Sequence, residues 1–362
     1  MFAKSIVTKG GDVFRDEYSL AFDGTNDNIS IPETTYDVDG GTVSFTFWAK
    51  RDDISVQNIV MGNHHNYSFI NLHSNANMYI ESDTNDDLAS APITNDTNWH
   101  HYVITCNSGT VAMYEDGISL TMGDSSIGDD ITISKISINT AKVFNGNISE
   151  VAIYNSALTA NQVKTIYNGR EPYNHKEGVA SGNLQGWWRM GDGSLDDYAL
   201  ICDETNATLG SNLITSFTNG STYAFDTFST SGNNISSAIE TSGNWGGAAS
   251  NSLNLTAGEI YKCTFDLTYN SGDDTLRVLL VNSANGAATS VVDVVYYTNT
   301  NGSNVFYFKV KTTDSTSHLQ LGTWHSSDVI NFSATNITLQ KVNGNAGYMF
   351  NMSATDIEGD TP

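Results

Sequence analysis

The chain has 362 residues, of which 39% are hydrophobic and 15% are charged. A disordered acidic protein would carry more charge and a membrane protein would have longer apolar runs, so this composition predicts a folded chain of about two or three domains. The 40 Asp and Glu residues outnumber the 16 Lys and Arg residues, which gives a net charge of -24. Because phosphate binding needs clustered basic side chains, this charge excludes nucleic acid and disfavours anionic membranes as partners.

The first residues, MFAKSIVTKGGDVF, contain neither the apolar segment nor the cleavage site of a secretory signal peptide. No apolar stretch approaches the ~18 residues that span a membrane. We therefore expect either a mature chain or one that is made and assembled in a cytoplasm, without membrane insertion. The three cysteines, Cys106, Cys202 and Cys263, are far apart, which predicts buried free thiols rather than disulfides.

Alternation of apolar and polar residues is the main pattern in the first part of the chain. Val43, Phe45, Phe47 and Ala49 fall on one face of an extended segment, which is typical of a strand with one face in a core. Further strands are expected at residues 18–22, 29–31, 59–61, 67–72, 78–81, 100–106, 111–115, 118–120, 131–138 and 147–154.

One short helix is predicted after these strands. Thr159 and Gln162 have the spacing of a capping box, in which each side chain bonds the backbone N–H of the other residue. Val163 and Ile166 follow at helical spacing, and Asn168, followed by glycine, is a typical helix end.

The alternation weakens between residues 173 and 210, where residues 186–193 are rich in aromatic residues and glycine. We predict an ordered connector there, and an extended tail after residue 343. Between them, a second series of strands is expected at residues 261–269, 276–281, 291–297, 305–311, 318–321 and 336–342.

The predicted fold is all-β: two jelly-roll-type antiparallel β-sandwiches in tandem, with an ordered connector and one short helix. The turns rich in glycine, asparagine and serine agree with this fold class. The predicted segments are the first sandwich at 1–172, the connector at 173–210, the second sandwich at 211–343 and the C-terminal tail at 344–362.

Four patches of the first sandwich resemble the laminin-G-like, concanavalin-A-like jelly-roll family. They are SLAFDGTNDNISI (19–31), TVSFTFWA (42–49), WHHYVI (99–104) with MYEDG (113–117), and FNGNISEVAIYNSALT (144–159). In order, they resemble the opening strand pair, a core strand, the central hairpin and the closing strand with its helix entry. The stretch WWRMGD (187–192) resembles the start of another copy of this domain, although no full copy follows.

The second sandwich resembles jelly-roll carbohydrate-binding modules, at residues 236–239, 253–258, 261–265 and 332–337. Such tandem arrays resemble tail, fibre or capsid-surface proteins of marine bacteriophages. The resemblance implies a non-enzymatic tail-fibre, capsid-decoration or adhesin component, located in the virion. It also implies assembly with other virion proteins, a homo-oligomer with a trimer favoured, and contact with host-surface glycans.

Two other classes stay open: a non-viral, extracellular carbohydrate-binding adhesin and a polysaccharide-degrading enzyme. Cleavage of a glycosidic bond needs two carboxylates about 5–10 Å apart, and no predicted strand places two acidic residues on one face. Asp52-Asp53 and Asp129-Asp130 fall in turns, and Glu150 is isolated in its strand. Because a Gly-x-Ser-x-Gly nucleophile elbow is also absent, we predict no catalytic residues.

Calcium is the expected cofactor, since laminin-G-like domains often carry one calcium ion held by loop oxygens. Asp23, Asn26 and Asp27 lie in the opening turn, and Asn145 and Asn147 lie before the closing strand. These segments could be neighbours in a jelly roll, and their oxygen atoms are the ligands that calcium prefers. The alternative is plain turn chemistry, in which Asp, Asn and Gly are common without a metal.

Glycan binding needs exposed aromatic side chains beside amides and carboxylates. Trp245 in a glycine-rich loop, and Trp324 with His325 near a strand end, are the candidates in the second sandwich. The alternative for each tryptophan is a place capping the core. Trp48 and Trp99 match framework positions of the resemblance and are predicted to lie in the core.

Overall fold

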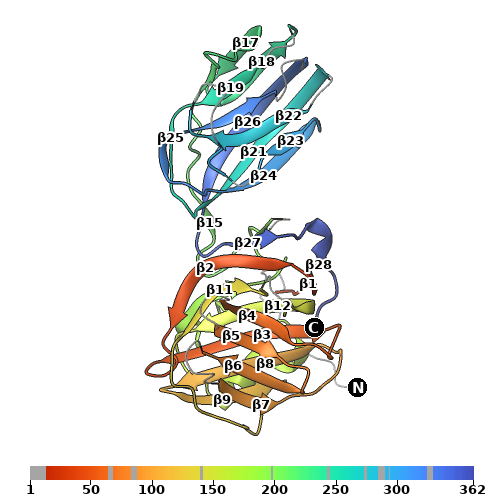
Figure 1. The fold of residues 1–362 in the computed structure, drawn as a ribbon, viewed down its shortest axis with the longest axis vertical. Coiled ribbons are helices and arrows are strands. Elements are labelled where there is room, and N and C mark those ends of the chain that lie inside the picture. The colour runs from red at the N-terminus through yellow and green to blue at the C-terminus, as the bar shows by residue number, and fades with distance from the viewer. Residues whose placement is uncertain are drawn as a thin grey trace. The chain divides into compact units, whose positions relative to one another are not determined.

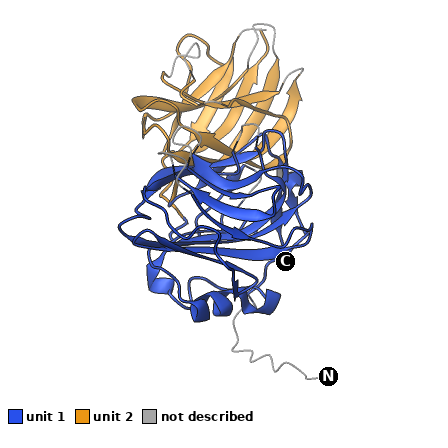
Figure 2. Cartoon of the chain, turned by 60° about the horizontal axis from the view of Figure 1, so that its bottom comes forward, with its two compact units in different colours: residues 1–207, 344–362 blue, residues 208–343 orange. Residues whose placement is uncertain are grey.

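The computed structural model describes residues 14–63, 68–82, 88–138, 142–196, 199–242, 245–272, 275–283, 290–292, 294–323 and 329–362. The described residues form antiparallel sheets and a single α-helix, so the all-β prediction is confirmed. The chain divides into two compact units (Figures 1 and 2). Unit 1 consists of residues 1–207 and 344–362, and unit 2 consists of residues 208–343.

The first sheet of unit 1 has the order β10-β9-β8-β3-β12-β1-β28, and β13 also pairs with β12. Every pairing in it is antiparallel, and β3 and β12 lie at its centre. Its strands are β1 (Ser19–Asp23), β3 (Thr42–Arg51), β8 (His100–Asn107), β9 (Thr110–Glu115), β10 (Ile118–Ser119), β12 (Asn145–Tyr154), β13 (Leu184–Trp188) and β28 (Ile357–Glu358).

The second sheet of unit 1 has the order β14-β27-β2-β11-β4-β5-β6-β7. Two of its strands, β4 and β5, are buried on both faces and therefore lack a strict alternation of buried and exposed residues. They are β2 (Asn28–Tyr36), β4 (Asn58–Asn63), β5 (Ser68–Leu72), β6 (Asn77–Glu81), β7 (Leu88–Pro92), β11 (Ile131–Ile136), β14 (Leu200–Ile201) and β27 (Gly347–Phe350).

One hydrophobic core joins the two sheets of unit 1, and β3 contributes alternate residues to it. Val43, Phe45, Phe47 and Ala49 are at most 3% exposed and all belong to this core, as their spacing predicts. Removing each large side chain of this kind from water contributes about 1.5–3 kcal/mol, so the period-2 pattern of β3 carries much of its folding free energy.

The other face of β3 is covered by α1 (Ala160–Tyr167). Thr159 Oγ1 accepts a hydrogen bond from the backbone N–H of Gln162 at 3.3 Å, and Gln162 Oε1 accepts one from the backbone N–H of Thr159 at 2.8 Å. The predicted capping box is therefore confirmed. Ile166 of the helix is buried, and Tyr167 packs on Trp48 of β3 with ring centroids 5.7 Å apart.

The segment 173–210, expected to be a connector, supplies a strand to each sheet of unit 1. β13 pairs with β12, and β14 pairs with β27. Trp187 and Trp188 of β13 are each 2% exposed. The short 3-10 helices η1 (Asn168–Arg170) and η2 (Ser181–Asn183) lie between α1 and β13.

Residues 344–362, expected to be an extended tail, form β27, the 3-10 helix η3 (Ala354–Asp356) and β28. β27 pairs with β2, and β28 pairs with β1. Beyond β28, the carboxylate of Asp360 accepts hydrogen bonds from Trp99 Nε1 at 2.9 Å and Lys50 Nζ at 2.5 Å. Unit 2 is thus inserted in sequence between two parts of unit 1.

Unit 2 has two further antiparallel sheets, with the orders β17-β18-β26-β21-β24 and β16-β19-β25-β22-β23; β15 also pairs with β26 and β20 with β25. Tyr261, Cys263, Phe265 and Leu267 alternate into its core and are at most 2% exposed, as the sequence predicts. Its strands are β15 (Thr208–Leu209), β16 (Phe217–Asn219), β17 (Thr227–Ser231), β18 (Asn234–Glu240), β19 (Gly247–Ser250), β20 (Leu253–Leu255), β21 (Ile260–Gly272), β22 (Leu276–Val281), β23 (Tyr296–Thr298), β24 (Gly302–Lys309), β25 (Asp314–Gly322) and β26 (Ile330–Asn343).

The three cysteines are buried free thiols, as predicted. Burial raises the pKa of Cys106 to about 12 and also raises the pKa of Cys263. Because the thiolate is the reactive form, both groups stay protonated and act as small apolar side chains.

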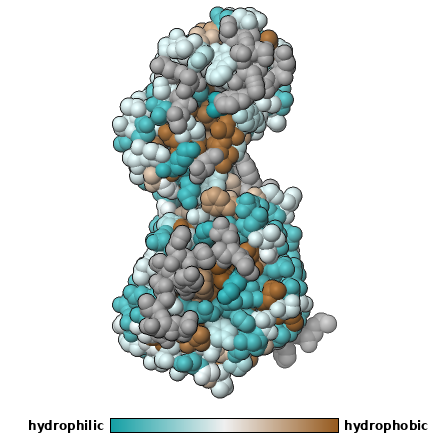
Figure 3. All heavy atoms as spheres, viewed as in Figure 1, coloured by the Kyte–Doolittle hydropathy of each residue, from teal (hydrophilic) through white to brown (hydrophobic). Residues whose placement is uncertain are grey.

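The surface is mainly hydrophilic in the view of Figure 3, with hydrophobic residues in separate patches. In the described part of the chain, the large hydrophobic side chains that are exposed are Tyr18, Val56, Ile118, Val294 and Tyr297. None of the helices in that part is long and apolar enough to cross a membrane.

The return of the chain to unit 1 makes a prediction about stability. Met349 of β27 is 4% exposed and lies in the core of unit 1. We expect Met349→Ala to lower the free energy of unfolding of unit 1 by about 2–5 kcal/mol, because it leaves a cavity in that core. Calorimetry should show this loss in one unfolding transition.

Leu319→Ala is the matched control, because Leu319 is fully buried in the core of unit 2. It should lower the other transition. A Met349→Ala variant that shifts the same transition as Leu319→Ala, or neither transition, would contradict the assignment of β27 to unit 1.

Candidate functional site

A groove in unit 1 collects side chains from the ends of several strands. Its described lining consists of residues 34–37, 42–43 and 154–155, with Gln185 and Asn345, and we call it the rim groove. It has a volume of about 370 Å³. This volume lies in the range of small-molecule sites, which is about 300–1,000 Å³.

Strand register explains why these residues meet. Residues 34–36 end β2 in the second sheet, whereas residues 42–43 begin β3 in the first sheet. β12 runs antiparallel to β3, so its last residue, Tyr154, lies opposite Ser44. The rim groove therefore forms at one end of the strands, where side chains of both sheets face solvent.

Tyr36 provides an aromatic side chain in the rim groove. Its ring packs edge-on against Phe45 of the other sheet, with centroids 5.4 Å apart, and the residue is half-buried. Burial raises the pKa of the Tyr36 hydroxyl to about 12. The hydroxyl therefore stays protonated at neutral pH and can both donate and accept a hydrogen bond.

Three amide side chains add polar groups to the groove. Asn155 Oδ1 accepts a hydrogen bond from Asn183 Nδ2 at 2.9 Å, and Asn345 Nδ2 donates one to Asp203 at 3.1 Å. Gln185 Nε2 reaches neighbouring backbone carbonyls at 3.3–3.4 Å. Among the described residues, no hydrogen bond uses Asn155 Nδ2, Gln185 Oε1 or Asn345 Oδ1, so the groove offers both donors and acceptors.

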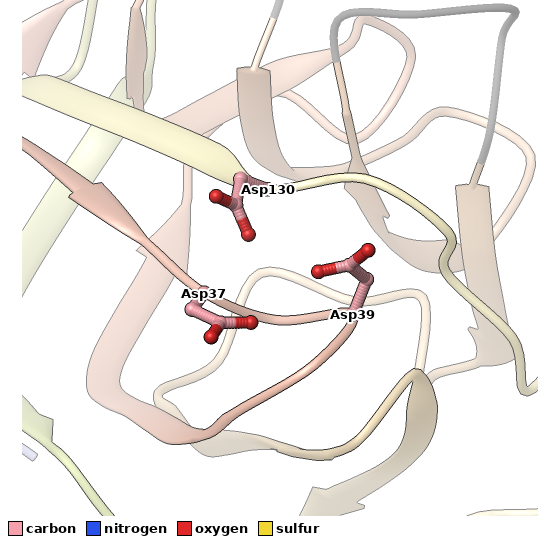
Figure 4. A group of neighbouring side chains, drawn as sticks. All are labelled: Asp37, Asp39 and Asp130. Carbon is pink, nitrogen blue, oxygen red and sulfur yellow. The ribbon is translucent and has the colours of Figure 1, made fainter.

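A cluster of three carboxylates lies at the edge of the rim groove (Figure 4). Asp37, Asp39 and Asp130 each have a carboxylate oxygen within 4.8 Å of the others. Asp130 precedes Ile131, which lies opposite Tyr36 in the β11–β2 pairing, and this register brings Asp130 beside Asp37. Partial burial, together with the charges of Asp37 and Asp39, raises the pKa of Asp130. All three residues are exposed, so the cluster gives the groove a negative rim.

The residues predicted to bind calcium lie at the opposite end of the same strands. Asp23 pairs with Asn145 in the β1–β12 register, so the opening turn and the start of β12 are neighbours, as expected. Asp27 is 4% exposed, and its Oδ2 accepts a hydrogen bond from the backbone N–H of Asp23 at 2.9 Å. The backbone N–H of Asn26 donates to Asp23 Oδ1 at 3.1 Å.

Asn147 differs from the other calcium candidates. Its Nδ2 donates to Ser19 Oγ at 3.1 Å and to Glu358 Oε2 at 3.2 Å, away from the opening turn. The assignment of calcium to this end of unit 1 stays a prediction.

Two further observations in the opening turn fit a cation. Burial and the nearby charges of Asp23 and Asp356 raise the pKa of Asp27 to about 6, so a positive ion would relieve carboxylate repulsion. Asn28 is 1% exposed, and among the described residues its Oδ1 has no hydrogen-bond partner. Oxygen ligands of these types suit calcium.

Glu150, the isolated acidic residue of its strand, has several hydrogen-bond partners from other parts of unit 1. Glu150 is 4% exposed and has a positive φ of 49° at an irregularity in the β12–β3 pairing. Its carboxylate accepts hydrogen bonds from Trp187 Nε1 at 2.5 Å and Arg189 Nε at 3.0 Å. The bulge re-aims the side chain, a change that strand alternation does not predict.

Asp16 and Asp192 extend this group of acidic residues. Asp16 Oδ1 accepts a hydrogen bond from Ser149 Oγ at 3.3 Å, and Asp192 Oδ2 accepts one from the backbone N–H of Tyr18 at 2.8 Å. Asp16 and Glu150 also line a small cavity of about 100 Å³. Burial raises the pKa of Asp16 to about 9 and of Glu150 to about 7; Glu150 adds to the first shift, and the charge of Arg189 opposes the second.

The adjacent histidines of β8 point in opposite directions, because successive side chains of a strand alternate. His100 bonds the carboxylates of Asp116 at 2.9 Å and Asp96 at 3.1 Å, whereas His101 bonds Thr46 Oγ1 at 2.7 Å. Burial lowers the pKa of His101 to about 3, so it is neutral. The two rings therefore do not form a shared metal site.

The structure describes one of the three residues of unit 2 that are predicted to bind glycans. Trp245 is half-buried and packs against Tyr223, with ring centroids 5.0 Å apart and planes tilted by 33°. Trp324 and His325 lie outside the described residues. The assignment of these three residues to glycan binding stays a prediction. Elsewhere, Trp48 and Trp99 are each 7% exposed, so both are buried as predicted, but Trp48 packs on Tyr167 of α1 rather than in the core between the two sheets.

One protein-family model matches part of unit 1. Residues 23–164 match the Laminin_G_3 family, which is described as the concanavalin A-like lectin/glucanases superfamily. The match covers less than half of the chain and includes β2, β3 and β12, which build most of the rim groove. No curated protein is significantly similar to the chain in sequence.

Among solved structures, a Bacteroides ovatus protein provisionally described as carbohydrate-binding has a TM-score of 0.41 and 16% identity, and the match covers 54% of this chain and 57% of that one. Domain 4 of AbnA, a GH43 extracellular arabinanase from Geobacillus stearothermophilus in complex with arabinotriose, has a TM-score of 0.33 and 19% identity, covering 44% and 84%. The Ruminococcus gnavus IT-sialidase CBM40 bound to α2,3 sialyllactose has a TM-score of 0.32 and 12% identity, covering 43% and 99%. The match spans less than two thirds of the Bacteroides protein.

The raised pKa values of Asp16 and Glu150 predict how stability depends on pH. Both carboxyls bind a proton more tightly in the folded chain than in the unfolded chain, so their protonation stabilises the fold. This contribution to the free energy of unfolding is fully present below about pH 4, and it is lost as the pH rises through about 7 for Glu150 and about 9 for Asp16. Between pH 7 and 9, where Asp16 still holds its proton in the folded chain, we expect a loss of about 1–3 kcal/mol, because one such group changes the free energy of unfolding by about 1.4 kcal/mol per pH unit. Urea unfolding at several pH values should show it, and Asp16→Asn should reduce it.

Asp124→Asn is the control for this pH dependence, because Asp124 is fully exposed and its pKa is lowered rather than raised. Its removal should leave the stability change between neutral and alkaline pH unaltered. A wild-type protein whose stability is constant over that range, or an Asp16→Asn variant with the same pH dependence, would contradict the prediction.

Calcium binding at the opening turn makes a second prediction for this site. We expect about 1 mM calcium to raise the unfolding temperature of unit 1, because an ion that binds only the folded state stabilises it by about 2.7 kcal/mol at a hundredfold excess over its Kd. Asp27→Asn should abolish the increase. Asp39→Asn, in the exposed cluster at the other end, should retain it, and an unfolding temperature that is the same in calcium and in EDTA would refute the assignment.

Proposed function

We propose that this protein binds glycans in the rim groove without cleaving them. The observation that carries the proposal is the composition of the groove: an aromatic ring, threonine hydroxyls and three amides around a volume of about 370 Å³. Sugars present apolar C–H faces and many hydroxyl groups, so an aromatic side chain beside donors and acceptors suits them.

Tyr36 supplies the aromatic part of this recognition. Its ring is held by Phe45, so little side-chain entropy is lost when a sugar packs against it. Val43, which is 3% exposed, adds apolar surface at the inner side of the groove. Gln185 and Asn155 are exposed and can hydrogen-bond sugar hydroxyls from the opposite sheet.

The carboxylates of unit 1 favour binding over cleavage. Hydrolysis needs two carboxylates on either side of the scissile bond. Asp37 is the single carboxylate among the described lining residues of the rim groove, and its Oδ1 is held by the backbone N–H groups of Gly40 and Gly41 at 2.8 and 2.6 Å. Glu150, in the small cavity, is bonded to Trp187 and Arg189.

The biological setting that we propose is the surface of a virus particle, as a tail-fibre, capsid-decoration or adhesin component that assembles with other virion proteins. This part of the proposal rests on the sequence resemblance. A trimer of this chain would present several rim grooves at once, and multivalent binding raises avidity without any new contact. A non-viral adhesin would use the groove in the same way.

The test of glycan binding compares variants of the two units. A glycan array identifies bound oligosaccharides, and calorimetry measures their Kd. We expect Gln185→Ala and Asn155→Ala each to weaken binding by about tenfold, the usual effect of removing one or two buried hydrogen bonds to a ligand. Trp245→Ala, in unit 2, is the matched control and should leave the Kd unchanged.

Both groove side chains are exposed, so their removal should not unfold the chain, and circular dichroism checks this. Loss of binding in Trp245→Ala but not in Gln185→Ala would move the site to unit 2. An array on which the intact chain binds no oligosaccharide would refute the proposed function.

A further inference from the structure

We infer that the rim groove selects neutral glycans and rejects glycans that carry sialic acid, uronic acid or sulfate at the bound position. This inference rests on the proposed function, since it concerns the class of glycan that the same groove takes. It follows from the charges of the described groove lining and of the acidic cluster beside it, which are all negative.

The described lining of the rim groove contains no Lys, Arg or His. Recognition of a sugar carboxylate or sulfate normally uses a guanidinium or ammonium group, because a charged donor offsets the loss of hydration of the anion. Here the donors are neutral: amides such as Gln185 and Asn155, and the hydroxyl groups of Tyr36 and the threonines. These groups match the hydroxyls of a neutral sugar.

Basic residues of the strands that form the groove lie far from it. β3 begins in the groove at Thr42 and ends at Arg51, so Lys50 and Arg51 are roughly 26 Å away along the strand. Both are engaged at that end: Lys50 with the carboxylate of Asp360, and Arg51 with the backbone carbonyl of Thr94 at 3.1 Å. They cannot neutralise an anion in the groove.

The carboxylates at the groove add repulsion. Asp37 lines the groove, and Asp39 and Asp130 have carboxylate oxygens within 4.8 Å of that of Asp37 (Figure 4). An anionic sugar would enter a region where three negative charges are already close together. Because these residues are exposed, salt screens the repulsion over a Debye length of about 10 Å at 0.1 M.

Asp37 also favours neutral sugars directly. The backbone N–H groups of Gly40 and Gly41 hold its Oδ1, and among the described residues no hydrogen bond uses its Oδ2. A fixed carboxylate oxygen is a strong acceptor for sugar hydroxyls, since a hydrogen bond to a charged acceptor is about twice as strong as a neutral one. The same oxygen repels a sugar carboxylate or sulfate.

The experiment uses an array of matched oligosaccharide pairs. Lactose, N-acetyllactosamine and other neutral chains are printed beside the same chains with a terminal sialic acid, uronic acid or sulfate. The Kd of the best pair is then measured by calorimetry at low and high NaCl. We expect the neutral member to bind at least about tenfold more tightly at low salt, and the difference to shrink at high salt because the repulsion is screened.

A double variant, Asp39→Asn with Asp130→Asn, tests the origin of the preference. Both residues are exposed and lie outside the described lining, so neutral binding should be kept while the penalty for the anionic member falls severalfold. Asp53→Asn, which removes a carboxylate beyond the far end of β3, is the control substitution and should leave both Kd values unchanged. A preference that is the same in the double variant would overturn the electrostatic explanation.

The remaining outcomes separate the two proposals. Equal or tighter binding of the sialylated, uronylated or sulfated member at low salt would overturn this inference and leave the proposed glycan binding intact. No binding of either member by the intact chain would overturn both. Binding of neutral members with an unchanged Kd in both Gln185→Ala and Asn155→Ala would place the site outside the rim groove and also overturn the inference.

Discussion

The pairing of β3 with β12 is the interaction on which unit 1 depends. β3 is buried on both faces: alternate apolar residues enter the core, while Trp48 on the other face packs against α1. β12 pairs with β3, β1 and β13, so it links two strands from the start of the chain to a strand near its middle. Two central strands with both faces covered can be rigid, and rigid strands hold the side chains at their ends in fixed positions.

An irregularity in that pairing buries a carboxylate, which costs free energy unless the carboxylate has partners. The bulge of β12 turns Glu150 into a buried position, where a carboxylate is unfavourable unless it has partners. Trp187 from β13 and Arg189 just after it provide hydrogen bonds and a positive charge. Arg189 also donates a hydrogen bond to the backbone carbonyl of Arg15, next to Asp16. Through Arg189, the buried Glu150 therefore connects the N-terminal segment to β12 and β13.

The two candidate sites of unit 1 lie at opposite ends of the same strands. β12 starts at the opening turn, where calcium is predicted, and ends at the rim groove, a separation of roughly 30 Å. An ion at one end would stabilise the sandwich without entering the groove at the other. If both proposals hold, this separation would allow calcium dependence and glycan specificity to be changed independently by substitution.

Local patterns in the sequence determined the all-β fold class, the capping box at Thr159 and the burial of the cysteines, because each depends on residues close together in the chain. Two sandwiches could be expected from the spacing of strands and turns. Tertiary pairing decided the rest: the tail supplies β27 and β28, Glu150 turns inward at a bulge, and the groove joins Tyr36 to Asn345, about 300 positions later. Alternation gives the face of each strand, but strand order and register depend on long-range contacts that no local pattern records.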